Sequence, residues 1–284
     1  MESTPGPLRS VLYIPGSKGR ALEKARSLAA DAIIFDLEDA VAPDEKAAAR
    51  ALLVETLAAG GYGRRMRIVR INALSTDWGR ADAEAAAAMD CDAVLVPKVD
   101  GPQDVAAVRG IVGDRPVWAM METPRGCLNA LAIADAPGMA GFVMGTNDLA
   151  KDLGARPRAD RMPMLAGLGA CLMAARAAGI ACVDGVYNAF RDEDGLRAEC
   201  EAGRDMGMDG KTLIHPAQID IANEVFAPSS AEIELAQRQI AAFDAAVAAG
   251  QGVAVVDGKI VENLHVASAR ALLARAEAIA AMGN

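Results

Sequence analysis

The fold is decided by a strand–helix unit that occurs twice within residues 10–59, SVLYIPGSKGRALEKARSLAADAIIFDLEDAVAPDEKAAARALLVETLAA. Two short apolar runs, 10–15 and 32–37, each precede an Ala-rich segment whose apolar residues recur at helical spacing. Strands that are apolar on both faces are typical of a parallel sheet covered by helices. This stretch therefore predicts an α/β fold with parallel strands.

The same unit continues along the chain and gives eight predicted strands. They cover Ser10–Pro15, Ala32–Leu37, Arg67–Ile71, Ala93–Pro97, Val117–Met121, Gly141–Met144, Ala181–Val186 and Thr212–Ile214. Eight strand–helix repeats are typical of a (β/α)8 TIM barrel. The alternative is a doubly wound open sheet, but residues 15–20 read PGSKGR where a dinucleotide-binding sheet carries G-x-G-x-x-G. We therefore predict a catalytic barrel over residues 1–228.

The sequence pattern changes after Pro228. Ser229–Ala249 predicts one long helix with Ser230 as its cap, and Ala267–Met282 predicts a final helix. Between them, Asp257-Gly258 separates two apolar alternating stretches and predicts a β-hairpin. We predict that residues 229–284 form a small C-terminal appendage that closes the active site of a neighbouring copy in a homo-oligomer.

Charge and composition narrow the class of protein. The 284 residues include 29 Lys plus Arg and 38 Asp plus Glu, which gives a net charge of −9. This balance argues against a nucleic-acid partner, because binding a polyanion needs clustered cations. No leader pattern and no uncharged window of membrane-spanning length is present, so we expect a cytoplasmic protein with no membrane partner. The five scattered cysteines predict free buried thiols.

Polar side chains follow the predicted strands, where catalytic groups of a barrel are found. Glu122 and Asp148 come after consecutive strands and can face the same barrel mouth. Two carboxylates, with water and substrate oxygens completing an octahedron, are typical of a Mg²⁺ site. The alternative is that each acid caps a helix or pairs with a surface cation.

Arg70 ends its predicted strand and should point into the same mouth. Its planar fork is suited to binding a carboxylate or thioester oxygen. The alternative is that it neutralises Asp36, Glu38 or Asp39. Strand alternation places Asp36 and Glu38 on one face and Asp39 on the other, and we expect at least one of them near the metal.

Other residues near the mouth give weaker signals. Gly145, Thr146 and Asn147 offer backbone N–H groups where a helix begins, which suits an anionic carboxylate. Lys18 and Lys24, beyond the first strand, either attract substrate phosphates or form a solvated helix face. For the lone histidines, His215 and His265, we predict structural roles.

Eight motifs, taken in order, resemble one known family. They are RSVLYIPGS, IIFDLEDAV, RINAL, VPKV, METPRG, MGTNDLA, KTLIHPAQI and VVDGKIVEN. As an ordered set they resemble the citrate lyase β-chain-like branch of the aldolase/citrate lyase superfamily, over residues 8 to 282. Members are (β/α)8 barrels that use Mg²⁺ in reactions of β-hydroxyacyl thioesters.

The resemblance implies roles for particular residues. It implies Glu122 and Asp148 as metal ligands and Arg70 as a substrate clamp. It further implies that Tyr13, Lys18 and Lys24 contact coenzyme A or substrate. Where lyase relatives carry an Asp supplied by a neighbouring subunit, this chain has Glu262, Asn263 and Leu264.

The C-terminal stretch VVDGKIVENLH most resembles members that act on malyl-CoA. This implies hydrolysis of (3S)-malyl-CoA to malate and CoA, with Glu262 or Asp39 activating water. Two alternatives share every binding group. One is C–C cleavage of malyl-CoA, or of citramalyl- or methylmalyl-CoA, to a 2-oxo acid and an acyl-CoA. The other is a citrate lyase β subunit that works on a carrier-protein thioester.

Overall fold

The structure is a computed structural model, and it describes residues 6–283. The chain divides into two compact units between Phe226 and Ala227. Within the described residues, no helix is long and apolar enough to cross a membrane. All five cysteines are buried and free, as predicted.

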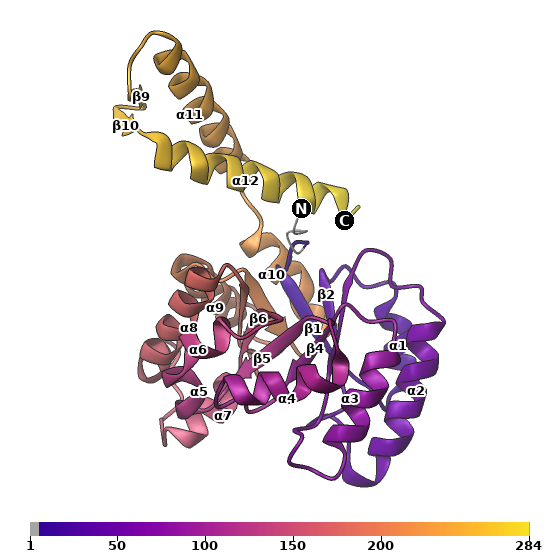
Figure 1. Cartoon of the computed structure of the whole chain (residues 1–284). Helices are drawn as coiled ribbons and strands as arrows, with labels where there is room; N and C mark the ends of the chain where they lie inside the picture. Colours follow the sequence, from indigo (N-terminus) through magenta and orange to yellow (C-terminus); the bar gives the residue numbers. More distant parts are fainter. Residues whose placement is uncertain (1–5, 284) are drawn as a thin grey trace. The chain divides into compact units, whose positions relative to one another are not determined.

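The first unit is a closed barrel of eight parallel strands (Figure 1). The strands are β1 (Ser10–Pro15), β2 (Ala32–Asp36), β3 (Met66–Arg70), β4 (Ala93–Val96), β5 (Val117–Met121), β6 (Met139–Met144), β7 (Ala181–Asp184) and β8 (Gly210–Leu213). Each strand pairs with its neighbour in the sequence, and β1 pairs with β8 to close the cylinder. The predicted (β/α)8 barrel is therefore confirmed, and every predicted strand overlaps an observed one.

Helices surround the barrel and connect its strands (Figure 1). They are α1 (Gly19–Ala25), α2 (Lys46–Ala58), α3 (Gly79–Ala88), α4 (Pro102–Val112), α5 (Pro124–Leu128), α6 (Ala130–Ala134), α7 (Thr146–Asp152), α8 (Leu165–Ala178), α9 (Glu193–Met206) and α10 (Ile219–Phe226). Three short 3-10 helices, Pro43–Glu45, Met162–Met164 and Pro216–Gln218, complete the connections.

Apolar residues fill both faces of the strands. One buried cluster, which includes Ile34, Leu95 and Trp118, lies inside the barrel. A larger cluster, which includes Phe35 and Val94, packs the outer face against the helices. Neighbouring residues thus point to opposite faces and both are buried, which is why the strands lack a polar alternation.

The second unit is a helix–hairpin–helix. It contains α11 (Ser230–Ala248), β9 (Ala254–Val256), β10 (Lys259–Val261) and α12 (Asn263–Ala281). The hairpin turn is Asp257-Gly258, where both residues have a positive φ, 51° and 75°, as a type I′ turn requires. The prediction that Ser230 caps α11 is wrong by one residue. The capping hydroxyl, which accepts a hydrogen bond from the Glu232 N–H, belongs to Ser229.

Candidate active site

A cavity of about 450 Å³ opens where the barrel strands end. Its lining contains most of the predicted site residues. These are Tyr13, Asp39, Arg70, Glu122, Gly145, Thr146, Asn147 and Asp148. The remaining lining residues are Asp36, Ala40, Met120, Met144, Val186, Asn188, Thr212 and Ile214. The carboxyl ends of β1, β2, β3, β5, β6, β7 and β8 thus contribute to one concave site, as expected for a barrel enzyme.

Glu122 directly follows β5 and is only 2% exposed. One carboxylate oxygen, Oε1, accepts a hydrogen bond of 2.7 Å from the backbone N–H of Lys98. Lys98 has a φ of 52°, in the left-handed region, which a non-glycine residue rarely adopts and which marks local strain. Burial, together with the charges of Glu38 and Asp148, raises the pKa of Glu122 to about 7.

Gly145 makes room for Glu122. A Cβ atom at position 145 would lie 2.3 Å from the Cβ of Glu122 and 2.6 Å from its Oε2. Only glycine allows such an approach without displacement. Asp148 follows three residues later, half-buried in the first turn of α7, and lines the same cavity.

The two acids fit a magnesium ion. Among residues 6–283, no group of three or more His, Cys, Asp or Glu side chains is placed to hold a metal. Mg²⁺, however, is usually held by one or two carboxylates and keeps several water or substrate oxygens. A buried carboxylate whose pKa is raised by burial and by neighbouring acids gains stability when a cation is present. The chemistry of the donor pair therefore suits Mg²⁺ better than a metal that needs a complete protein cage.

Three acidic side chains surround the Arg70 guanidinium. Nε and Nη2 donate to the two oxygens of Asp36 at 2.7 and 2.6 Å. Nη1 lies 2.7 Å from Glu38 Oε2 and 3.7 Å from Asp39 Oδ2. These neighbours raise the pKa of Arg70 further against the opposing effect of its burial, so the side chain stays charged. Arg70 thus neutralises the neighbouring acids, which was the alternative role considered for it. It also lines the cavity, where a substrate could reach it.

The predicted division of the three acids between two faces is wrong. Strand β2 ends at Asp36, so the residues that follow no longer alternate. The backbone N–H groups of Glu38 and Ala40 both turn back to donate to the Asp36 carboxylate, at 2.8 and 3.1 Å. This turn brings Glu38 and Asp39 to the same guanidinium. Burial and the nearby acids raise the pKa of Glu38 to about 7.

Tyr13 forms a wall beside Arg70. Its ring centroid lies 5.0 Å from the Arg70 Cζ, a cation–π contact. Its hydroxyl donates to the Met120 sulfur at 3.3 Å. Burial raises the pKa of Tyr13 well above its usual range, so the phenol stays neutral and can orient a ligand.

Three predicted residues do not line this cavity. Lys18 is exposed and lies 3.8 Å from Glu45, and Lys24 is exposed on α1. Glu262 belongs to the second unit, where its backbone N–H donates to His265 Nδ1 at 3.0 Å. His215 accepts from the Ala217 N–H through Nδ1 at 3.2 Å, so both histidines have the predicted structural roles.

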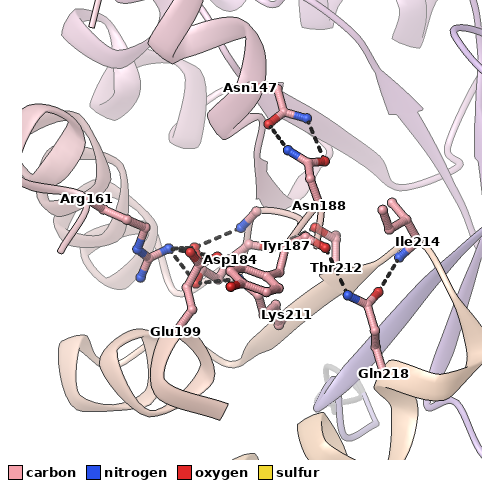
Figure 2. Close-up of polar contacts among 11 residues, drawn as sticks. Asn147, Arg161, Asp184, Tyr187, Asn188, Glu199, Lys211, Thr212, Ile214 and Gln218 are labelled. Atoms are coloured by element: carbon pink, nitrogen blue, oxygen red, sulfur yellow. Dashed lines mark hydrogen bonds and ion pairs between the residues drawn. The ribbon is translucent and has the colours of Figure 1, made fainter. Parts of the chain in front are cut away.

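Sequence reasoning named Asn147 but missed the polar residues near it on the β7–β8 side, among them its partner Asn188 (Figure 2). Asn147 and Asn188 exchange side-chain amide hydrogen bonds of 2.8 and 3.3 Å. Nearby, Asp184 accepts from Arg161 Nη1 at 2.7 Å and from Lys211 Nζ at 3.2 Å. A lysine inside a buried strand such as GKTL needs a carboxylate partner, and that signal was available in the sequence.

Comparison with known proteins gives a consistent set of relatives. A family model described as HpcH/HpaI aldolase/citrate lyase matches residues 9–216. A (3S)-malyl-CoA thioesterase of Cereibacter sphaeroides (strain KD131) is 70% identical over 275 residues, which cover 97% of this chain and 96% of the relative. A citrate lyase subunit beta of Escherichia coli (strain K12) is 34% identical, covering 95% of this chain and 93% of that protein.

A solved structure supports the same relationship. Protein CitE from Mycobacterium tuberculosis, in complex with magnesium, acetoacetate and coenzyme A, matches with a TM-score of 0.80 and 31% identity. The match covers 96% of this chain and 99% of that one.

Proposed function

This chain belongs to the HpcH/HpaI aldolase/citrate lyase family, and from that premise we propose that it is a Mg²⁺-dependent enzyme that hydrolyses (3S)-malyl-CoA to malate and CoA. The observation that carries the proposal is the buried Glu122 carboxylate, which shares one cavity with Asp148 and Arg70. The 70% identity to a (3S)-malyl-CoA thioesterase supports the choice of substrate.

Glu122 and Asp148 are the residues that would hold the metal. A bound Mg²⁺ would supply a Lewis acid that stabilises negative charge developing on substrate oxygens. Glu122 is kept in place by the Lys98 N–H and by the space at Gly145. The chain thereby fixes one carboxylate before any ligand arrives, which lowers the cost of binding.

Arg70 stabilises charge on the thioester oxygen. Asp36 holds the guanidinium through two hydrogen bonds, so Arg70 is oriented in advance and loses little entropy when it binds. Tyr13 covers one face of the same group. Arg70 has five N–H groups; two donate to Asp36 and one Nη1 N–H faces Glu38, so the remaining two can serve the thioester oxygen.

Hydrolysis needs a base for the attacking water. Asp39 is exposed at the cavity beside Arg70 and can accept that proton, and Glu262 is the second candidate. The water oxygen bonds to the thioester carbon, the C–S bond breaks, and the departing CoA thiolate takes up a proton. The lysines Lys18 and Lys24 would attract the phosphates of CoA at the barrel rim.

The rival reaction is C–C cleavage, and the match to citrate lyase subunit beta keeps it open. In that reaction a base removes the hydroxyl proton, and the products are glyoxylate and acetyl-CoA. Purified protein incubated with malyl-CoA and Mg²⁺ distinguishes the two. Hydrolysis gives malate and free thiol in equal amounts, whereas glyoxylate as the main product overturns the thioesterase proposal. Turnover only of a carrier-protein thioester identifies a citrate lyase subunit.

The appendage completes the proposal. We infer that the enzyme is a homo-oligomer in which residues 229–284 close a neighbouring active site. The inference rests on the small core of the second unit, in which only a few side chains are buried, among them Val261 and Val266.

A further inference from the structure

One buried side chain, Arg161, belongs to the connection between α7 and α8. Among the residues that lie between Leu149 and Leu168, only Arg161 is buried, with 4% of its surface exposed. Arg161 does not line the cavity, but α7, the helix that precedes it, carries Asp148. We infer that Arg161, through its ion pair with Asp184, is a positioning residue for Asp148. The inference rests on the proposed function, in which Asp148 holds Mg²⁺.

Arg161 is part of a buried cluster of four charges (Figure 2). Its Nη1 donates to both oxygens of Asp184, at 2.7 and 2.8 Å, and lies 3.9 Å from Glu199. Lys211 Nζ lies 3.2 Å from Asp184 and 2.6 Å from Glu199. Two cations thus balance two carboxylates. Without Arg161, a buried carboxylate would lose its main partner, so the ion pair holds the connection firmly against the end of β7.

The first link from Arg161 to Asp148 runs through the connection itself. The backbone oxygen of Arg161 accepts a hydrogen bond of 2.9 Å from the Met164 N–H, which closes the 3-10 helix Met162–Met164. This 3-10 helix packs against α7 and α8. Arg161 has a φ of 51°, a left-handed conformation that a non-glycine residue keeps only where its surroundings hold it. The bond to Asp184 therefore fixes the segment that supports α7.

The second link runs through the residue that follows Asp184. The Gly185 N–H donates at 2.8 Å to Asp184 Oδ1, an oxygen that Arg161 also holds. A Cβ at Gly185 would lie 2.4 Å from Thr146 Oγ1, so this backbone lies close against the first residue of α7. Asp148 follows Thr146 by two residues. Asp184 is thus linked both to the beginning of α7 and to the segment that comes after it.

Helix α7 depends on these contacts. It has seven residues, of which Thr146 and Leu149 are buried, and a helix this short has little stability of its own. Loss of Arg161 should therefore let Asp148 shift relative to Glu122, which the Lys98 N–H holds independently. Removing a group that orients a metal ligand typically costs about 10- to 100-fold in metal affinity.

The test measures Mg²⁺ affinity by isothermal titration in four proteins, which are the wild type, Arg161→Ala, Asp148→Asn and the double variant. Arg161→Ala should weaken Mg²⁺ binding by about tenfold or more. In the Asp148→Asn background the same substitution should change the affinity by less than about twofold, because Arg161 acts through Asp148 and two coupled residues do not add.

Arg176→Ala is the matched control. Arg176 makes a similar ion pair, with the two oxygens of Asp209 at 2.9 and 3.0 Å, but this pair lies before the start of β8. The control variant should keep the wild-type Mg²⁺ affinity. If Arg161→Ala does not fold, Arg161→Lys replaces it. We expect this variant to weaken Mg²⁺ binding by about threefold or more, because a lysine does not reproduce the planar guanidinium.

Trypsin cleavage reports the position of the connection without any metal. The bond between Arg158 and Ala159 lies in an exposed part of the connection. Arg161→Ala should raise the initial rate of cleavage at this bond by about tenfold or more, because the segment opens locally when its buried side chain is lost. Arg176→Ala should leave that rate within about twofold of the wild type.

The outcomes separate this inference from the proposed function. If Asp148→Asn keeps wild-type Mg²⁺ affinity, the proposed metal site is wrong and the inference fails with it. The inference alone is overturned if Asp148→Asn weakens Mg²⁺ binding and the Arg161 variant does not, or if Arg161→Ala has the same effect in both backgrounds. Unchanged cleavage after Arg158 in Arg161→Ala also overturns it, since Arg161 would then not hold the connection.

Discussion

The side chain of Glu122 occupies the space that any side chain at Gly145 would need, with only 2.3 Å between its Cβ and a Cβ added there. This relationship joins the end of β5 to the start of α7, which carries Asp148. The glycine therefore sets how closely the two proposed metal ligands approach.

Substituting Gly145→Ala should displace Glu122 and weaken Mg²⁺ binding by about tenfold or more, since small shifts of supporting groups around a metal cost that much. Isothermal titration with Mg²⁺ measures the effect. Gly110→Ala is the matched control, because an added Cβ there meets nothing within 4 Å. Equal Mg²⁺ affinity in both variants would show that the contact does not position the site.

Substituting Arg70→Lys keeps the charge but loses the fork that holds Asp36. We expect kcat/KM for malyl-CoA to fall by about 100-fold or more, as on loss of an oxyanion donor, and stability to fall by about 1.5–3 kcal/mol. Arg9→Lys breaks a similar buried bidentate pair, with Asp31, before β1 and away from the cavity. That variant should lose stability but keep its kcat/KM. If kcat/KM falls by a similar factor in Arg70→Lys and Arg9→Lys, Arg70 has only a structural role.

The raised pKa values of Glu38 and Glu122, each about 7, predict a pH dependence. In the metal-free protein these groups hold protons that the unfolded chain has released, so between about pH 4.5 and 7 their contribution to stability falls as pH rises. Mg²⁺ competes with the proton on Glu122, so its affinity should rise from pH 6 to pH 8. Thermal unfolding with and without Mg²⁺ measures both effects. Glu122→Gln should remove most of the pH dependence of Mg²⁺ affinity, and an unchanged dependence would contradict the assignment.

Deleting residues 250–284 should lower malyl-CoA turnover by about 100-fold or more while leaving Mg²⁺ affinity nearly unchanged, because the appendage would cover the bound substrate and carry Glu262, whereas both proposed metal ligands belong to the barrel. The point variant Glu262→Gln tests one side chain of the same segment. Turnover at the wild-type rate after the deletion would end the proposal that the appendage is a lid.

The barrel could be predicted because its strands carry one signal throughout. A strand such as AIIFD is apolar at every position before its last, and only a sheet covered on both faces needs that pattern. The exact ends of the strands could not be predicted from this pattern. The chain turns at Asp36, one residue before the predicted end, because the Asp36 carboxylate accepts two backbone N–H groups that follow it.

The site was predicted only in part, because spacing reveals where a strand ends but not which side chains meet across the barrel. Glu122, Asp148 and Arg70 were found from their positions after strands. Asn188 lies in the loop after β7, and its partner Asn147 is 41 residues away, so no local pattern reports their contact. The left-handed backbone of Lys98 is equally invisible in the sequence VPKV.

The most direct test replaces each proposed metal ligand with its amide. Glu122→Gln and Asp148→Asn should each weaken Mg²⁺ binding by about tenfold or more and reduce malyl-CoA consumption by a comparable or larger factor. Asp92→Asn, which removes one charge from an ion pair with Arg67 outside the cavity, should do neither. If both site variants keep wild-type Mg²⁺ affinity and thioester turnover, the two-carboxylate account of this enzyme is wrong.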